Sequence, residues 1–294
     1  MVKVVTVLIW PVGLAVIVGA AALLASRRWA APAMAPGGSS PPAPAGPPPA
    51  GPVAGSTIPA VARSAARFLL IIIAGTAVIY AVMVLLGLIV VHAGPAVDKP
   101  VLHWVSAQRI HLWDRVMTQA TKIGDTWTTR AAVVTAAVCL AVAWRRARWL
   151  PPVAVAALIV VWRGLTVAIH HTIPRIGPPG HPDGTFPSGG SARAIAFYGL
   201  IAYLLWREFS GSRRGAIWAG AVVAALGFNE GYSRLYLGMH WFTDVPSGWL
   251  YGCMLLALFI TAVRLVAGPA RAPTPAGGPS LARRATAPAW EGPP

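Results

Sequence analysis

The sequence predicts an all-α protein: a polytopic membrane bundle with a core of six transmembrane helices and one extra transmembrane helix at the N-terminus. Hydrophobic residues make up 56% of the 294 residues and charged residues only 11%, whereas soluble domains are about one quarter charged. Apolar stretches of roughly 20 residues, the length that crosses a bilayer, recur along the chain. Lys and Arg gather in alternate connections between them, as they do on the cytoplasmic side of membrane proteins.

The expected transmembrane helices follow from seven apolar stretches. They lie near residues 5–25, 68–91, 131–144, 152–171, 191–206, 215–231 and 246–266. A further segment, 98–125, is amphipathic, with tryptophans interleaved with charged residues. It is typical of one or two helices at the outer membrane interface, or of a packed external loop.

Composition divides the chain into four regions. Residues 1–28 form a transmembrane anchor, 29–64 a disordered linker rich in Pro, Ala and Gly, 65–266 the six-transmembrane domain, and 267–294 a disordered Pro-rich tail. A cleaved signal peptide is the alternative for the first region. The anchor is favoured because cleavage would place Arg63 and Arg67 on the wrong face of the membrane.

The charge distribution predicts the topology. The net charge is +16, and most of the Lys and Arg residues flank the linker or follow the third, fifth and seventh stretches. The positive-inside rule therefore places the linker and the tail in the cytoplasm. Segments 93–130, 172–190 and 232–245, which hold most of the acidic residues, are then extracytoplasmic loops of a multi-pass cell-membrane protein. This pattern explains the charge without a nucleic-acid partner.

The first chemical pattern is SRLYLGMHWFTD, residues 233–244. His240 and Asp244 are four residues apart, so on a helix they would share a face and the carboxylate could accept the Nδ1–H of the imidazole. Nε2 would then be free to act as a base or a nucleophile. Arg234 offers a planar fork that suits phosphate. The alternative is an interfacial Arg and a His that bonds to a loop carbonyl.

The second pattern is GTFPSGGSARA, residues 184–194. Ser188, Gly189 and Gly190 form a turn that leads into a helix, where backbone N–H groups and the helix dipole favour an anion. Arg193 falls in the first helical turn, where a cation opposes the dipole, so we expect it to have an anionic partner or to face solvent.

The third pattern is HHTIPRIGPPGHPD, residues 170–183. It brings His170, His171, Arg175 and His181 to the same side as the other two patterns. Each His could be a simple surface residue. A zinc site is disfavoured because no Cys or Glu is spaced as a partner ligand. We therefore expect no metal and no cofactor.

Together these residues resemble the integral-membrane branch of the type 2 phosphatidic acid phosphatase and vanadium haloperoxidase superfamily. Ser233, Arg234, His240 and Asp244 match its third motif in full. Pro187, Ser188 and Gly189 match the start of its second motif, Pro-Ser-Gly-His. The resemblance covers about residues 65–266, which would be a six-transmembrane phosphatase-like domain.

The resemblance implies a phosphohistidine mechanism on a lipid phosphate or diphosphate at the outer membrane face. His240 would attack phosphorus and Asp244 would orient it. Arg234, Ser188 and the backbone near Gly189 and Gly190 would hold the phosphoryl oxygens. Such in-line transfer depends mainly on positioning and charge stabilisation.

The sequence departs from the family in two motifs. Gly190 replaces the family's general-acid His, a loss that typically costs roughly 10²–10⁴-fold, so reduced activity is expected. In the first motif, His170 takes the basic position and Gly177 the Arg position. Arg175 would then bind phosphate in place of the missing Arg, and His170, His171 or His181 could supply the acid. Arg193 could add further charge for the phosphate.

Two alternatives use the same residues. One is a catalytically weakened relative that binds lipid phosphate, and the other is a phosphotransferase that uses the same His. The sequence specifies neither the lipid nor the number of chains in the assembly. A separate expectation concerns Arg163, in the middle of the fourth stretch. A charge there costs at least ~2.5–3.5 kcal/mol, so Arg163 should face the bundle interior and pair with a carbonyl or with Glu230.

Overall fold

The computed structural model describes residues 58–143, 148–181 and 184–267, and this part of the chain is almost entirely helical. Its elements are α2 (Ile58–Ala93), α3 (Pro95–Ala107), α4 (His111–Ala120), the 3₁₀ turn η1 (Thr121–Gly124), α5 (Thr126–Ala143), α6 (Leu150–Thr172), α7 (Gly189–Leu205), the π-helical turn η2 (Trp206–Ser210), α8 (Arg213–Tyr236) and α9 (Asp244–Ala267). No β-strand is formed within these ranges, and the predicted all-α fold is confirmed.

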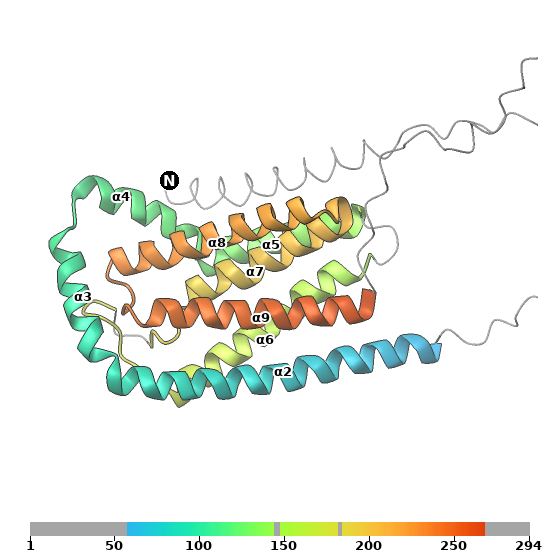
Figure 1. Ribbon diagram of the computed structural model, residues 1–294, viewed down its shortest axis with the longest axis horizontal. Helices are drawn as coiled ribbons and strands as arrows, with labels where there is room; N and C mark the ends of the chain where they lie inside the picture. The colour runs from blue at the N-terminus through green and yellow to red at the C-terminus, as the bar shows by residue number, and fades with distance from the viewer. Residues whose placement is uncertain (1–57, 144–147, 182–183, 268–294) are drawn as a thin grey trace, which may run out of the picture.

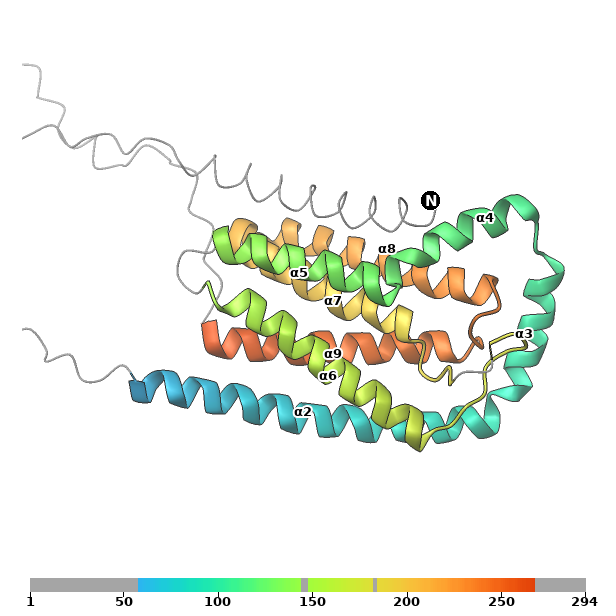
Figure 2. The ribbon, with the colours of Figure 1, turned by 180° about the vertical axis from the view of Figure 1, so that it is seen from behind.

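The long helices lie side by side around α7 (Figures 1 and 2). α7 packs against α5, α8 and α9, and α9 packs in turn against α2. Nearly every residue of α7 is buried, because small residues let its neighbours approach closely. α3 and α4 cross one end of the bundle, where the connection between α6 and α7 also lies (Figure 1). This end carries the chemical patterns of the sequence.

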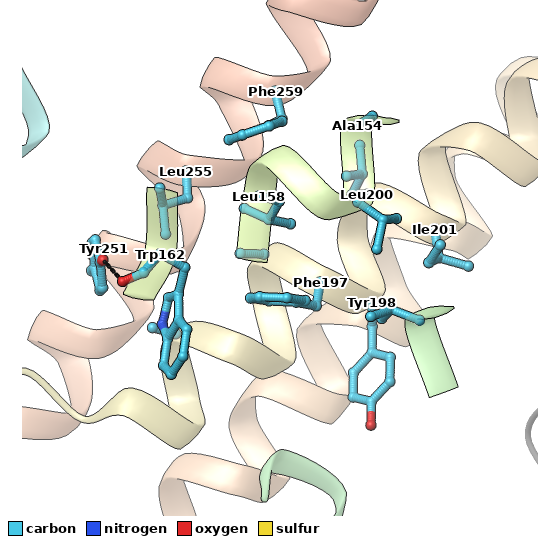
Figure 3. Close-up of a cluster of buried hydrophobic side chains, with 14 of the residues drawn as sticks. Ala154, Leu158, Trp162, Phe197, Tyr198, Leu200, Ile201, Tyr251, Leu255 and Phe259 are labelled. Carbon is cyan, nitrogen blue, oxygen red and sulfur yellow. Dashed lines mark hydrogen bonds between the residues drawn. The ribbon is translucent and has the colours of Figure 1, made fainter. Parts of the chain in front are cut away.

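The core joins the three helices that lead to this end. Figure 3 shows Leu158 and Trp162 of α6 facing Phe197 and Leu200 of α7, with Tyr251 of α9 beside them. The rings of Trp162 and Phe197 meet edge to face, with centroids 6.0 Å apart, an arrangement that aromatic pairs prefer. The Tyr251 hydroxyl donates to the Trp162 carbonyl at 3.2 Å. Packing therefore fixes α6, α7 and α9 relative to one another.

The structure supports a multi-pass membrane protein. Within the part of the chain that the structure describes, four helical segments are long and apolar enough to cross a bilayer, namely Ala66–Ala93, Thr126–Ala143, Leu150–Thr172 and Asp244–Ala267. Many large apolar side chains of α2 are exposed, among them Leu70 and Ile73, as expected for a surface in contact with lipid. The predicted stretches 191–206 and 215–231 are helical as α7 and α8, although neither meets the same criterion.

Two local predictions are wrong. Residues 58–64 were expected in the linker but form the first turns of α2, since the helix extends beyond its apolar stretch. Arg163 is exposed rather than interior, because Leu158, Trp162 and Leu165 take the inner face of α6. Segment 98–125 forms α3, α4 and η1, in line with the two-helix alternative. The anchor 1–28, the rest of the linker and the tail beyond Ala267 lie outside the described residues.

Candidate active site

The connection between α8 and α9 places the residues of the SRLYLGMHWFTD pattern. α8 ends at Tyr236, and Gly238 turns the chain with a φ of 68°, a conformation that favours glycine. The N–H of Met239 donates back to the carbonyl of Arg234 at 2.9 Å. Arg234 therefore lies in the last turn of α8, His240 in the connection, and Asp244 at the first residue of α9.

His240 is held by the backbone as well as by a carboxylate. Its Nδ1 lies 3.1 Å from the carbonyl oxygen of Thr185 and 3.7 Å from Oδ2 of Asp244. The sequence suggested a helical pair in which Asp244 alone accepts the Nδ1–H. Residues 237–243 are not helical, and the Thr185 carbonyl is the nearer acceptor. With Nδ1–H donated to that carbonyl, Nε2 carries the lone pair.

Burial governs the protonation of His240. Desolvation of its buried ring lowers the pKa of His240 below the ordinary value of 6.5, and this outweighs the opposing effect of the nearby Asp244 carboxylate. The neutral imidazole, which is the nucleophilic form, is thereby favoured.

Asp244 is the centre of a buried ionic network. It is fully buried and forms an ion pair with Arg175, which also pairs with Asp98. Asp98 accepts hydrogen bonds from the backbone N–H of Thr243 at 2.9 Å and from its hydroxyl at 3.0 Å. The guanidinium of Arg175 thus contacts two carboxylates. These contacts favour a role in holding Asp244 over the predicted contact with phosphate.

The second pattern lies against the first. Ser188 is the N-cap residue of α7 and is fully buried, and its N–H donates to the carbonyl of Asp244 at 3.0 Å. Its hydroxyl lies 3.0 Å from that of Ser191. Gly189 and Gly190 form the first turn of α7, where backbone N–H groups lack intrahelical acceptors. The predicted anion-binding turn and the predicted nucleophile are therefore at the same end of the bundle.

Two arginines line the other side of this turn. Arg234 forms ion pairs with Glu230 and with Asp125, the latter at 3.2 Å. Arg193 is buried, donates to the carbonyl of Gly124 at 2.8 Å and lies 5.0 Å from the centre of the Trp162 ring. The carbonyl and the ring take the place of the anionic partner or solvent that the sequence suggested for Arg193.

The three histidines at the end of α6 and in the α6–α7 connection differ in their surroundings. His171 and His181 are exposed. His170, at the end of α6, has a buried Nε2 that no polar group of the described residues contacts. The Trp162 Nε1 and the Thr185 hydroxyl are also buried and unpaired within those residues. Because buried polar groups are normally hydrogen-bonded, these three atoms offer unused hydrogen-bonding capacity.

A cavity of about 280 Å³ adjoins the network at Arg175. Its walls come from the end of α2, the start of α3, the α6–α7 connection and the α8–α9 connection. It is lined by Val91, Pro95, Asp98, Lys99, Pro174, Arg175, Ile176 and Trp241. Among the described residues, no group of three His, Cys, Asp or Glu side chains is arranged to hold a metal ion.

Comparison with known proteins agrees with this arrangement. Residues 166–266 match the model of the PAP2 superfamily. This part of the chain is therefore similar to the PAP2 superfamily. The matched segment runs from the second half of α6 to the end of α9, and it includes His240, Asp244, Arg234 and the Ser188 turn.

Two curated proteins are similar to part of this chain. The chain is 38% identical over 77 residues to phosphatidylglycerophosphatase B of Bacillus subtilis, which covers 25% of this chain and 36% of the relative. It is 42% identical over 79 residues to an uncharacterized 22.5 kDa protein in the cps region of Klebsiella pneumoniae, covering 26% and 36%. The chain thus spans about a third of the length of these curated relatives.

A solved structure shares the fold. The crystal structure of a transmembrane PAP2-type phosphatidylglycerolphosphate phosphatase from Bacillus subtilis matches with a TM-score of 0.56. The two are 22% identical, and the match covers 63% of this chain and 94% of that one. It supports the all-α transmembrane fold described above.

Proposed function

We propose that this protein belongs to the PAP2 superfamily and is a membrane lipid phosphatase that hydrolyses a lipid phosphate or diphosphate through a phosphohistidine. The observation that carries the proposal is the hydrogen bond that fixes the imidazole of His240. Its Nδ1 is bound at 3.1 Å by a backbone carbonyl, which leaves Nε2 as the nucleophilic nitrogen beside the N-terminus of α7.

The neighbouring groups suit phosphoryl transfer. Arg234 and the N–H groups of Gly189 and Gly190 would bind the phosphoryl oxygens, and the Ser188 hydroxyl would add a donor. Nε2 of His240 attacks phosphorus as the bond to the lipid oxygen breaks, and water then hydrolyses the phosphohistidine. The buried Asp244 stabilises the imidazolium that forms during attack. Arg175 and Asp98 act on the reaction only by holding Asp244.

The leaving oxygen requires a proton. Gly190 has no side chain to supply it, so another residue must be the donor. Of the three candidate histidines, His170 is the best placed, since its Nε2 is buried and unpaired within the described residues. His171 and His181 are exposed. We assign the proton donor to His170.

The lipid substrate follows from the membrane setting. A substrate whose acyl chains remain in the bilayer needs its head group to reach a polar site at one end of the helices, which is where His240 lies. Phosphatidylglycerophosphatase B is among the relatives, so a phosphatidylglycerophosphate-like monoester is the first substrate to test. The positive-inside distribution of Arg and Lys supports an extracytoplasmic site.

The test is phosphate release by the purified protein in detergent, with EDTA present. Lipid monophosphates, including phosphatidylglycerophosphate, and lipid diphosphates are offered to the wild type, to His240→Ala and to His111→Ala. His111 is exposed on α4 and serves as the matched control. We expect turnover in the wild type and the control, loss in His240→Ala, and a phosphorylated peptide containing His240 after rapid quenching.

Other outcomes would select the alternatives. Lipid-phosphate binding without release, even with alcohol acceptors added, would identify a binding protein. Release only when an acceptor is present, with the phosphoryl group recovered on that acceptor, would identify a phosphotransferase.

A further inference from the structure

α8 contains a carboxylate in an unusual place. Glu230 is fully buried and lies one turn before Arg234. Burying a charged side chain is costly unless it is paired, and in membrane proteins such residues usually have a function. The superfamily motifs of this chain do not include position 230, so its role must be found from its contacts.

The contacts of Glu230 are all with hydrogen-bond donors. Its Oε1 accepts from the Nε of Arg234 and, at 3.4 Å, from the hydroxyl of Thr121. Its Oε2 accepts from the backbone N–H of Gly124 at 2.9 Å. Each of these three groups is a donor, so the buried carboxylate is paired by hydrogen bonds at both of its oxygens.

Arg234 is consequently held from two directions. Glu230 binds its Nε, and Asp125, half exposed, binds its Nη2 at 3.2 Å. Nη1 is the guanidinium nitrogen that these carboxylates leave to a phosphoryl oxygen. A planar guanidinium fixed at two nitrogens has little freedom to choose another orientation.

The Glu230 carboxylate also lies between two glycines, Gly124 and Gly190. A Cβ built on either glycine would come within 3.0 Å of this carboxylate, and a Cβ on Gly190 would meet the Nε of Arg234 as well. The ion pair therefore takes the space into which a side chain at position 190 would begin to extend. Glycine at this position is a steric requirement of the Glu230–Arg234 pair.

We propose that Glu230 is a positioning residue for phosphoryl transfer: its carboxylate takes the space of the side chain absent at position 190 and holds the Arg234 guanidinium toward the phosphoryl oxygens. This inference rests on the proposed function, in which Arg234 binds the phosphoryl group. The positioning role of Glu230 also explains why position 190 is a glycine. Residues 190 and 230 form a complementary pair, in which the carboxylate on α8 occupies the space that a side chain at position 190 of α7 would need.

The first test asks whether Glu230 acts through Arg234. Glu230→Gln keeps the shape but removes the charge, and Arg234→Lys keeps the charge but removes the Nε contact. We expect Glu230→Gln to lower kcat/KM roughly 10- to 100-fold, as a small misplacement of a binding group does. In the Arg234→Lys background the same change should cost less than about threefold, because the coupled contact is already lost. Asp114→Asn, an exposed carboxylate paired with Arg109, is the control.

The second test asks whether residues 190 and 230 share one space. Gly190→Ala should lower kcat/KM at least about tenfold in the wild type and less than about threefold in a Glu230→Ala background. Equal losses in both backgrounds, in either test, would overturn the inference. If Glu230→Ala does not yield monodisperse protein, the Glu230→Gln cycle decides.

Binding of inorganic phosphate, measured by calorimetry on the same variants, separates this inference from the proposed function. Coupled losses of phosphate affinity in a protein that releases no phosphate from any lipid would refute the hydrolase and support the positioning role. Normal lipid hydrolysis, together with losses of phosphate affinity that are equal in both backgrounds, would support the hydrolase and refute the positioning role.

Discussion

The carbonyl oxygen of Thr185 lies 3.1 Å from Nδ1 of His240, 55 residues away in sequence. Because a carbonyl only accepts, it selects the tautomer of the ring that carries its hydrogen on Nδ1. The acceptor belongs to the connection between α6 and α7, while the ring belongs to the connection between α8 and α9. The two segments that carry the family motifs are joined by this contact and by the hydrogen bond from Ser188 to Asp244.

The pH dependence of activity should reflect the burial of His240. Because burial lowers its pKa below 6.5, and because the neutral ring is the nucleophile, the acid limb of kcat/KM should lie below pH 6.5. The measurement is kcat/KM between about pH 5 and 8 in detergent. An acid limb centred above pH 6.5 would contradict the assignment of His240 as a buried neutral nucleophile.

Replacing Asp244 should alter both the rate and this profile. Asp244→Asn removes the carboxylate that favours the imidazolium, so the acid limb should move to lower pH. The rate should fall because the imidazolium loses its stabilising carboxylate, but by less than the roughly 10⁴-fold seen in serine proteases, where the Asp also sets the tautomer of the His. A profile that does not move would mean that Asp244 acts without influencing His240.

The Asp98–Arg175–Asp244 network should contribute strongly to stability. Arg175→Ala leaves two buried carboxylates without their shared partner, and removing one partner of a buried pair costs about 3–5 kcal/mol. The measurement is thermal unfolding in detergent. Arg109→Ala, which breaks an exposed pair with Asp114, is the matched control and should cost no more than about 1 kcal/mol. Similar losses in both variants would show that the network is not a buried stabilising unit.

The proton donor can be identified by varying the leaving group. His170→Ala should lower the rate roughly 10²–10⁴-fold with a lipid alkyl phosphate, whose leaving oxygen needs a proton. It should have little effect with an aryl phosphate, whose leaving group is stable as an anion. His171→Ala and His181→Ala should leave both rates unchanged. A His170→Ala loss that is the same for both substrates would assign His170 to phosphate binding instead.

Gly248 should be intolerant of a side chain. A Cβ at this position would come within 3.0 Å of the Ser188 carbonyl oxygen, so Gly248→Ala should push the Ser188 turn from α9 and reduce both stability and kcat/KM. Gly220→Ala is the control, since open space surrounds that position on α8, and a helical Ala there should stabilise by roughly 0.5–1 kcal/mol. An unaffected Gly248→Ala would mean that the two helices separate easily.

Much of this structure could be predicted from the sequence because its signals are local. Apolar length predicted the helices in 65–266, although it placed residues 58–64 in the linker. The third motif could be recognised because its residues lie within twelve positions of one another. Arg163 was misplaced because length and apolarity do not say which face of α6 packs inward.

The missed residues are those whose roles depend on distant contacts. Asp98 meets Arg175 across 77 residues, and Glu230 meets Gly124 across 106. Nothing in the spacing of either acidic residue indicates its partner. The role of Arg175 changed for the same reason, because two buried carboxylates from other parts of the chain compete for its guanidinium.

The Thr185 carbonyl has a consequence for how this protein can diverge. A main-chain oxygen is present whatever side chain stands at position 185, and the buried threonine hydroxyl takes no part in holding the ring. A substitution at position 185 therefore cannot remove the acceptor that sets the tautomer of His240. Only an insertion, a deletion or a shift of the backbone between α6 and α7 can do so, which makes the length of that connection, rather than its composition, the feature that selection must preserve.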